Sequence, residues 1–401
     1  MGESVLIIVE NLPLPFDRRA WMEARTLREA GYEVSVICPT GKGYEALTET
    51  IDGIHIYRHE LPPERHSALG YFEEYFSALS AEWRLAHRVY RERGFDIIHA
   101  CNPPDLIFLV AAWFKLVHRV KFLFDHHDLN PELYESKFGR RDVFYYGLRL
   151  VERLTFAMAD TVISTNDFYK DVAVTRGGKR PDRVFVVRSA PDLRIFQPVA
   201  PNPKYRHGRR YLVGYLGVMG PQDGLDHLLE AARELKDVQF CLIGNGPMFE
   251  SLKTMAAQMG IADRVEFTGR IGDAEVIDRL CSCDLCVNPD PLNPLNDVST
   301  MNKILEYMAL GRPVVQYDLR EGRLSAADAS WYAEPNNPRD LAAKIGQLLD
   351  DAAARQKMSD AGRRRMVESL EWRHQAPRLL EAYRFTLSPR GRCAAIPTRR
   401  M

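Results

Sequence analysis

The stretch VLIIVENLPLPFDRRAWMEARTLREAGYEVSVI, residues 5–37, contains the first repeating unit of the chain. It opens with a run of five apolar residues at 5–9, continues with a helical pattern that stops at Gly31, and ends in a second strand-like run at 33–37. Unbroken hydrophobicity is typical of strands that are buried on both faces, as in a parallel sheet. Strand, helix, glycine and strand make a βαβ unit, which predicts an α/β fold.

The same alternation continues along the chain in two series. Strands of the first are expected at residues 97–99, 122–124, 161–164 and 184–187, and strands of the second at 212–216, 240–243, 265–267, 285–287 and 313–315. The proline-bearing segment between the series, residues 196–208, is typical of a linker. We predict two Rossmann-like, doubly wound parallel-sheet domains that face each other across a cleft. Their expected bounds are 1–196 with a returning helix at about 373–387, then 209–372, then a disordered tail at 388–401.

The composition excludes several classes of protein. The 401 residues include 54 basic and 54 acidic side chains, so the chain lacks the basic excess of a nucleic-acid-binding protein. Its longest apolar run, residues 106–114, is too short to cross a bilayer. Seven scattered cysteines, and a first segment without the positive charge of a secretion signal, favour a reducing compartment. We therefore expect a cytoplasmic protein without a transmembrane segment.

Three predicted strand ends of the second domain are rich in glycine. Ligands of open α/β sheets bind at the carboxyl ends of the strands, where glycine lets backbone N–H groups approach a phosphate. The alternative is that each glycine only permits a tight turn; three such loops together favour a nucleotide. No third glycine completes a dinucleotide fingerprint, and no P-loop motif occurs. The candidate nucleotide-binding residues of these loops are Gly217, Gly220, Gly244, Asn245, Gly246, Thr268, Gly269 and Arg270.

A helix predicted over residues 301–310 carries a cation and a carboxylate on one face. Ser299 or Thr300 is positioned to cap it, so that its first N–H groups point toward a ligand. Lys303 suits a diphosphate, and Glu306, three residues on, suits the two hydroxyl groups of a ribose. The alternative is an exposed ion pair without a function.

The run Asp-His-His-Asp at residues 125–128 directly follows a predicted strand of the first domain. Four titratable groups at a strand end are costly unless they are solvated or paired. His127 can donate to a sugar hydroxyl or orient a reacting group, and a structural network of His with Asp is the alternative. His99 is a second candidate on the same side. The three thiols within residues 281–286 lack the second pair that would complete a zinc site, so we expect buried structural cysteines.

These motifs together resemble glycosyltransferase family 4, whose members have the GT-B architecture of two Rossmann-like domains. The resemblance covers nearly the whole chain. Its most specific mark is Asn302-Lys303-x-x-Glu306 with the residues that follow it up to 315. The other marks lie at residues 17–19, 23–25, 30–34, 127–128, 159–164, 242–247 and 267–269.

The resemblance implies transfer of a sugar from a nucleotide diphosphate sugar to an acceptor hydroxyl, with retention of the anomeric configuration and without a metal or other cofactor. It implies that Glu306 holds the ribose, and that His127, next to Asp128, faces the donor sugar. The glycine-rich loops and Asn302 would line the nucleotide pocket. Such enzymes need no protein nucleophile, so their main electrostatic task is to stabilise the leaving diphosphate.

The chain departs from the family pattern at three positions. Val298 stands where a glutamate is expected eight residues before the ribose carboxylate, and the adjacent Asp297 is the candidate to replace it. Val218 and Asp223 replace an arginine and a lysine of the first glycine loop, which leaves Lys303 and helix-end amides to carry the phosphate. The glycine spacing of this loop and the Asn-Lys-x-x-Glu motif resemble a branch of the family linked to surface polysaccharides and lipid-linked sugars.

Two further segments bear on the partners. Asp17, Arg18 and Arg19 follow the first strand and are candidates to bind acceptor or phosphate, with a helix cap and solvated surface as the alternative. Residues 137–153 mix basic and aromatic side chains, which suits either a lipid interface or packing on the sheet. The expected partners are a nucleotide-sugar donor, a saccharide or lipid-linked acceptor and the inner face of a membrane, and no nucleic acid.

Two other functions fit the same sequence. Val218 and Asp223 also suit a catalytically silent GT-B chain that binds nucleotide or a partner enzyme. A sugar-nucleotide epimerase would need acid and base carboxylates in the cleft, and would change the sugar of an intact nucleotide without an acceptor.

Overall fold

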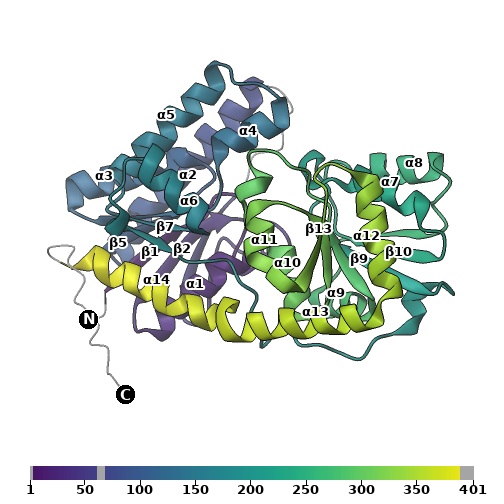
Figure 1. Cartoon of the computed structure of the whole chain (residues 1–401). Helices are drawn as coiled ribbons and strands as arrows, with labels where there is room; N and C mark the ends of the chain where they lie inside the picture. Colours follow the sequence, from purple (N-terminus) through teal and green to yellow (C-terminus); the bar gives the residue numbers. More distant parts are fainter. Residues whose placement is uncertain (1–2, 61–67, 389–401) are drawn as a thin grey trace. The chain divides into compact units, whose positions relative to one another are not determined.

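The structure is a computed structural model that describes residues 3–60 and 68–388. The chain divides into two compact units, each an α/β domain with its own sheet (Figure 1). Unit 1 comprises Met1–Glu135, Arg140–Arg188 and Gln375–Met401, and unit 2 comprises Ser136–Gly139 and Ser189–His374. The first unit thus ends at Arg188 rather than at 196, because Leu193 and Phe196 are buried in a core cluster of unit 2. The predicted tail, apart from its first residue, lies outside the described residues.

Unit 1 is built on an eight-stranded sheet of order β3-β4-β2-β1-β5-β6-β7-β8. All neighbours in it are parallel except β3 and β4, an antiparallel edge pair that the hydrophobic pattern did not predict. Its strands are β1 Ser4–Ile8, β2 Glu33–Pro39, β3 Thr48–Ile51, β4 Ile54–His59, β5 Ile97–Cys101, β6 Lys121–His126, β7 Thr161–Ser164 and β8 Val184–Val186. The helices that contribute residues to unit 1 are α1 Arg18–Glu29, α2 Ala68–Glu92, α3 Phe108–His118, α4 Asn130–Phe138, α5 Val143–Met158, α6 Asp167–Asp171 and α14 Trp372–Leu387.

The two faces of this sheet differ in chemistry. Successive side chains of a strand point to opposite faces, so Phe122 and Phe124 of β6 join the apolar core beneath α2, α3 and α5. Asp125 lies on the other face, beside Cys101 of the neighbouring β5 in the strand register. Helices α1 and α14 cover that second face (Figure 1). A polar layer is therefore buried between them and the sheet.

Unit 2 has a six-stranded, wholly parallel sheet of order β11-β10-β9-β12-β13-β14. The order reverses between β9 and β12, which confirms the predicted doubly wound parallel sheet. Its strands are β9 Tyr211–Leu216, β10 Val238–Ile243, β11 Val265–Gly269, β12 Leu285–Asn288, β13 Val314–Tyr317 and β14 Ser330–Ala333. Its helices are α7 Leu225–Glu234, α8 Phe249–Gln258, α9 Asp273–Ser282, α10 Asn302–Ala309, α11 Arg320–Ala326, α12 Pro338–Asp350 and α13 Ala352–Arg365.

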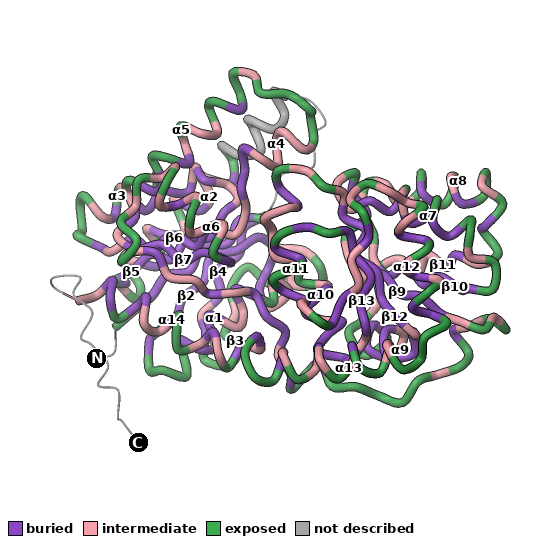
Figure 2. The backbone as a smooth tube through the Cα atoms, viewed as in Figure 1, coloured by how far each residue is buried: buried purple, intermediate pink, exposed green. Residues whose placement is uncertain are grey.

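Two apolar clusters flank this second sheet. Residues of α7, α8 and α12 pack with one set of strand side chains, and residues of α9 and α10 pack with the other. Cys281, Cys283 and Cys286 belong to the second cluster and are at most 2% exposed, which confirms that they are buried structural residues. Figure 2 shows the same layering, with buried strands inside helices that are partly exposed. Within the described ranges, no helix combines the length and the apolar character needed to span a membrane.

Candidate functional site

In unit 2, the loops after β9 and β10 touch through their backbones. A Cβ atom at Gly244 would lie 1.9 Å from the carbonyl oxygen of Gly217, and one at Gly246 would lie 2.6 Å from that of Met219. Met219 also donates its amide to the carbonyl oxygen of Asn245 at 3.2 Å. Glycine is required at 244 and 246 because two chains approach each other there, whether or not a phosphate binds.

The glycine amides of these loops are already used within the protein. Four of them donate to protein oxygens, and nucleotide binding by these loops stays a prediction. The amides of Gly217, Gly220, Gly244 and Gly246 donate to Ile243 O, Asp223 Oδ2, Gly269 O and Asn245 Oδ1 at 3.0, 2.9, 3.0 and 2.7 Å.

Helix α10 begins without a side-chain cap. Its N-cap residue is Met301, and the predicted caps have other partners. Thr300 donates its hydroxyl to Glu321 Oε1 at 2.8 Å, and Ser299 donates to the carbonyl oxygen of Leu295 at 2.7 Å. The cap prediction is thus wrong, because the helix begins at Asn302 and its N-cap residue is Met301. The side chain of the N-cap residue accepts no hydrogen bond from the first amides of α10, and a helix N-terminus attracts anions.

Lys303, in the first turn of α10, is held between two carboxylates. Its Nζ lies 2.9 Å from Asp290 Oδ1 and 3.6 Å from Asp223 Oδ1, and only 10% of its side chain is exposed. Burial alone would lower the pKa of Lys303, but Asp290 and Asp223 outweigh it and raise the pKa. Burial raises the pKa of Asp290 against the pull of Lys303. The ammonium is therefore a partly neutralised cation rather than a free one.

The other predicted site residues of unit 2 differ in their hydrogen-bond partners and in their burial. Asp297 accepts from the backbone N and Nε of Arg320 at 2.9 and 2.6 Å, so its carboxylate forms an ion pair on α11. Thr268 donates its hydroxyl to the carbonyl oxygen of Gly269 at 2.7 Å. Asn245, Arg270 and Asn302 are exposed, whereas Glu306 is half-buried.

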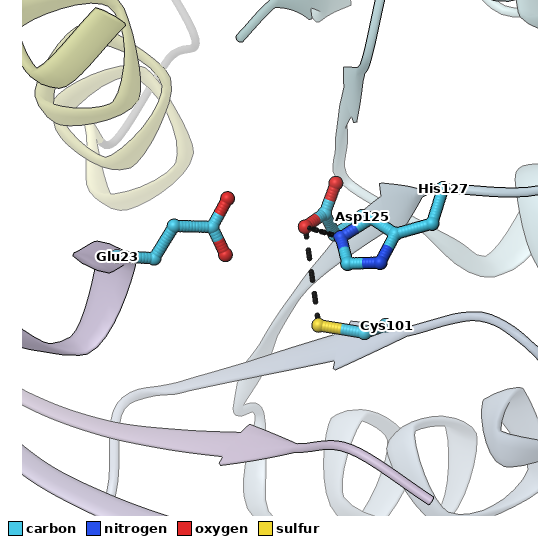
Figure 3. A group of neighbouring side chains, drawn as sticks. All are labelled: Glu23, Cys101, Asp125 and His127. Atoms are coloured by element: carbon cyan, nitrogen blue, oxygen red, sulfur yellow. Dashed lines mark hydrogen bonds and ion pairs between the residues drawn. The ribbon is translucent and has the colours of Figure 1, made fainter. Parts of the chain in front are cut away.

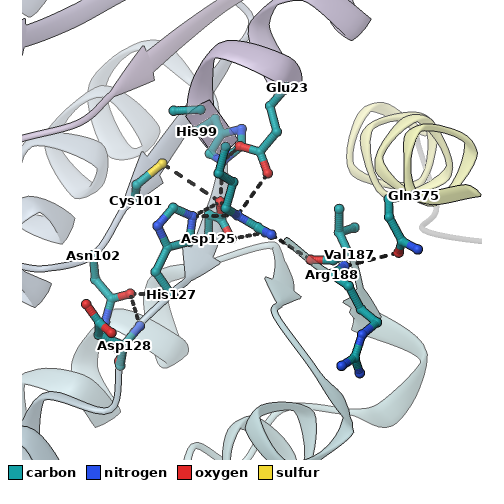
Figure 4. A network of polar contacts seen from close by, with 12 residues as sticks. Glu23, His99, Cys101, Asn102, Asp125, His127, Asp128, Val187, Arg188 and Gln375 are labelled. Atoms are coloured by element: carbon teal, nitrogen blue, oxygen red, sulfur yellow. Dashed lines mark hydrogen bonds and ion pairs between the residues drawn. The ribbon is translucent and has the colours of Figure 1, made fainter. Parts of the chain in front are cut away.

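In unit 1, Arg19 is at the centre of the buried polar layer, of which Figure 4 labels Glu23, His99 and Asp125. Arg19 donates from Nη2 and Nε to the two oxygens of Asp125 at 2.9 and 3.2 Å, and from Nη1 to the carbonyl oxygen of Val187 at 2.8 Å. Glu23 Oε1 lies 3.2 Å from the same Nε. His99 contacts the layer from β5, with Nε2 at 3.4 Å from Asp125 and Nδ1 at 2.7 Å from the hydroxyl of Tyr383. We call Arg19, Glu23, His99, Asp125 and Tyr383 the buried polar cluster.

His127 stands at the rim of this cluster. Its Nε2 contacts Asp125 Oδ2 and lies 2.8 Å from Nε of Arg19, and 17% of its side chain is exposed. Asn102 Oδ1 accepts from the amides of His127 and Asp128 at 2.6 and 3.2 Å. These contacts fix both the backbone and the ring, so His127 is a rigid group at a strand end.

Two carboxylates of the cluster, together with the adjacent Cys101 and His127, form the one group in the described residues that has the composition of a metal site (Figure 3). Ligand atoms of Glu23, Cys101, Asp125 and His127 all lie within 4.8 Å of one another. The Arg19 guanidinium already lies against three of these four residues. Because a protein cation matches the negative charge there, we assign no metal to the group.

The two carboxylates of the cluster differ in ionisation. Burial opposes the charge on Asp125, but Arg19 and then His127 outweigh it and hold the pKa of Asp125 well below its usual value. Burial and the charge of Asp125 raise the pKa of Glu23 well above its usual value, against the pull of Arg19. Asp125 is therefore the ionised partner of Arg19, and Glu23 favours its neutral form.

Several predictions for unit 1 are corrected. Asp125 and His126 are the last residues of β6 rather than the first of a loop. His126 is fully buried among the rings of Phe124, Phe156 and Tyr169, so it belongs to the apolar core.

For residues 17–19, the sequence left two roles open: binding of acceptor or phosphate, or a helix cap with solvated surface. Asp17 is the N-cap of α1 and accepts from the amide of Ala20 at 3.0 Å, as the alternative held. Arg18 is exposed, whereas Arg19 is buried and committed to Asp125 and Val187. Direct binding of acceptor or phosphate by Arg19 is therefore not supported.

Sequence reasoning missed three residues that these contacts bring forward. Asp290 follows β12 between two prolines, and a carboxylate at a strand end was a signal that could have found it. Glu23 lies one helical turn after Arg19 and was visible only as part of a family motif. Tyr383 is 284 residues from its partner His99, and nothing local points to that contact.

Comparisons with known proteins agree with this architecture. Two family models match the chain, a glycosyl transferase 4-like domain over residues 17–190 and glycosyl transferases group 1 over residues 210–351. The chain is 25% identical over 415 aligned positions to the MMP alpha-(1->4)-mannosyltransferase of Mycolicibacterium hassiacum, which covers 92% of this chain and 94% of that protein.

Two further proteins are similar in part of the sequence or in fold. A GDP-mannose-dependent alpha-(1-6)-phosphatidylinositol monomannoside mannosyltransferase of Mycolicibacterium smegmatis is 28% identical over 191 positions, 44% of this chain and 49% of that protein. The structure of sucrose-phosphate synthase from Thermosynechococcus elongatus superposes with a TM-score of 0.81 at 19% identity, over 95% of this chain and 98% of that one. That likeness shows the GT-B fold.

Proposed function

Because the chain belongs to glycosyltransferase family 4, we propose that it moves a sugar from a nucleotide diphosphate sugar to an acceptor hydroxyl, as a retaining, metal-independent hexosyltransferase. The observation that carries the proposal is the start of α10, where an uncapped helix N-terminus, the Lys303 ammonium and the Glu306 carboxylate follow one another. An uncapped N-terminus attracts a phosphate, and a carboxylate can accept both hydroxyl protons of a ribose.

In the proposed reaction, the acceptor oxygen bonds to the anomeric carbon while the bond from that carbon to the diphosphate breaks. The acceptor attacks on the face that the diphosphate leaves, and its proton passes to the departing phosphate oxygen, so the configuration is retained without a protein nucleophile. The task of the protein is to stabilise the charge that develops on the diphosphate. We assign this task to the first amides of α10 and to Lys303, since the loop glycines donate elsewhere.

We assign the donor sugar to His127. Asp125 and Arg19 both contact Nε2 of this ring, so Nδ1 is the nitrogen left to meet a sugar hydroxyl. The buried carboxylate holds the ring in one orientation, which lowers the cost of ordering it on binding. Asp128, whose amide is held by the same Asn102, is the second group that we assign to this position.

We further propose that the acceptor is a lipid-linked sugar or a polysaccharide of the cell envelope. One relative is named for transfer of mannose to a phosphatidylinositol mannoside, which supports a lipid-linked acceptor. An acceptor of that kind stands at a membrane surface, where the chain would have to meet it as a peripheral protein.

The proposal is tested first by nucleotide binding and then by turnover. A nucleotide that binds only the folded chain must stabilise it, so UDP, GDP or ADP should raise the melting temperature. Release of that nucleoside diphosphate is then measured over a panel of donor sugars with Glu306→Ala and, as a matched control, Glu230→Ala on the exposed side of α7. We expect the first variant to lose binding and turnover and the second to keep both.

A catalytically silent chain is the second candidate, favoured by the two carboxylates that neutralise Lys303. It predicts a nucleotide-dependent rise in melting temperature without release of diphosphate from any donor. An epimerase predicts a changed sugar on an intact nucleotide, with no need for an acceptor. The absence of a thermal shift with every nucleotide would contradict all three functions.

A further inference from the structure

Exposed apolar side chains are concentrated on two neighbouring helices of unit 1. Of the seventeen large hydrophobic side chains that are exposed among the described residues, nine lie on α3 and α5. These two helices contain 27 residues, a small part of the chain. The nine are Leu109, Trp113, Leu116 and Val117 of α3 and Val143, Phe144, Tyr146, Leu150 and Leu154 of α5.

Helix α5 is apolar on both of its sides. Val143, Tyr146, Leu150 and Leu154 are spaced by three or four residues and so form one strip along the helix, with exposed fractions of 76%, 63%, 58% and 43%. The opposite side, which includes Phe156, is buried against the sheet. Packing on the sheet therefore explains only half of the apolar residues of α5.

Helix α3 repeats this arrangement beside α5. Leu109, Trp113 and Leu116 recur at helical spacing and are exposed by 42%, 42% and 76%. Lys115, on the same helix, donates to the carbonyl oxygen of Met158 in the last turn of α5 at 2.7 Å. Figure 2 shows exposed residues on both helices. The two strips thus belong to adjacent helices of one compact unit.

Helix α5 itself contains two arginines and one glutamate. Arg149 and Arg153 lie on α5, and neither side chain forms an ion pair or hydrogen bond with another described residue. The sole carboxylate of α5, Glu152, is buried and pairs with Arg176. The exposed side of α5 therefore offers apolar and cationic groups without an anion, a combination that complements anionic lipid headgroups above an apolar layer.

We propose that α3 and α5 form a docking surface that lies in the interface of a bilayer containing anionic lipid. The surface consists of the nine exposed apolar residues with Arg149 and Arg153. The inference rests on the proposed function, because a surface bound to the bilayer would bring the enzyme to a lipid-linked acceptor. A bilayer suits the surface better than a protein partner because the strips are rows of long apolar side chains bordered by arginines that have no ion pair among the described residues.

The test uses the full chain and two kinds of vesicle, phosphatidylcholine alone and phosphatidylcholine with phosphatidylglycerol. We expect flotation with the second kind only, and less of it as the salt concentration rises. Leu150→Asp/Leu154→Asp should weaken binding by about tenfold or more, because two apolar groups no longer leave water. The matched control is Leu292→Asp/Leu324→Asp on unit 2, where both leucines are similarly exposed, and it should bind as the wild type does.

The arginines are tested separately. Arg149→Gln/Arg153→Gln should weaken binding to anionic vesicles by roughly twentyfold, since each basic residue near such a surface contributes about fivefold. Arg233→Gln/Arg364→Gln, which removes two exposed arginines of unit 2, should not change it. The emission of Trp113 should shift to the blue on binding, and Trp113→Tyr should lack that shift.

The proposal is overturned if the wild type does not float with anionic vesicles, or if the control variants lose as much binding as the surface variants. It is also overturned if Leu150→Asp/Leu154→Asp converts a dimer to a monomer in sedimentation while vesicle binding persists, because the surface would then join two copies. Nucleotide-dependent stabilisation of the same variants, measured without vesicles, separates this inference from the proposed function. The surface variants should show the same nucleotide-dependent rise in melting temperature as the wild type. If the wild type itself showed no such rise, that result would count against the proposed function and not against the docking surface.

Discussion

Asp290 accepts a hydrogen bond from Lys303 at 2.9 Å, with both side chains almost withdrawn from solvent. Removing the cation alone leaves a buried carboxylate without its partner, so Lys303→Met should lower the free energy of unfolding by about 3 kcal/mol. Lys303→Met/Asp290→Asn should recover most of that loss. Urea unfolding at pH 7 measures both.

Nucleotide binding separates the two roles of Lys303. If the ammonium also contacts the diphosphate, the stable double variant still binds nucleotide at least about tenfold more weakly than the wild type, the order of one charge-assisted contact. Titration calorimetry with the nucleotide that stabilises the wild type measures this. Wild-type affinity in the double variant would restrict Lys303 to a structural role.

The carboxylates of the buried polar cluster should respond differently to neutralisation. Asp125→Asn leaves the buried guanidinium of Arg19 without its closest ionic partner and should cost about 3 kcal/mol of unfolding free energy. Glu23 has a raised pKa and favours its neutral form, so Glu23→Gln should cost less than about 1 kcal/mol. Chemical unfolding of both variants at pH 7 makes the comparison, and equal costs would mean that Glu23 is ionised.

His126 should make the protein sensitive to acid. Burial is the main cause that lowers the pKa of His126 from 6.5 to about 3. Above pH 6.5 both the folded and the unfolded chain hold this ring neutral; below it only the unfolded chain binds the proton, so stability falls with pH by about 1.4 kcal/mol per unit down to the folded pKa. His126→Phe keeps an aromatic ring and removes the titration.

The measurement is the difference in unfolding free energy between His126→Phe and the wild type. It should shift in favour of the variant by about 2 kcal/mol between pH 6.5 and pH 5. His118→Phe, on the exposed end of α3, is the control substitution. A constant difference for His126→Phe would mean that the buried ring takes up a proton in the folded state.

The contact between the two glycine loops should tolerate no side chain. A Cβ at Gly244 would overlap the carbonyl oxygen of Gly217, and its φ of +133° is one that other residues rarely adopt. Gly244→Ala should therefore cost about 3 kcal/mol and reduce nucleotide binding. Gly272→Ala, whose Cβ would meet nothing within 4 Å, should cost about 0.5 kcal/mol. Similar melting temperatures for the two variants would show that the loops can separate.

The parallel strands were predictable because burial on both faces leaves an unbroken apolar run, as at residues 5–8 of β1 and 240–243 of β10. The end of β6 was not predictable, because this strand continues through two polar residues, Asp125 and His126. Asp125 is stable there only through Arg19, and His126 only through aromatic rings from other elements. The β3–β4 pair was missed because β3 alternates between exposed and half-buried residues.

The candidate site was predictable in its residue types and less so in its contacts. The Asn302-Lys303-x-x-Glu306 motif indicated the helix and the family, yet the sequence held no sign that Asp290 and Asp223 neutralise Lys303. The sequence analysis attributed the glycines of the two loops to phosphate binding. In the structure, the close approach of the two loop backbones explains Gly244 and Gly246. Contacts between distant segments determine which of several roles a residue takes, and a local pattern does not contain them.

The hydrogen bond between His99 and Tyr383 has a consequence for biosynthesis. Residues 189–374, all in unit 2, fill the whole interval between Arg188 and Gln375 of unit 1, so a ribosome makes all of unit 2 before Tyr383. Until then, nascent unit 1 has the nitrogen of His99 without its hydroxyl partner and lacks α14 over that face. During translation, the domain made first is therefore the last to be completed.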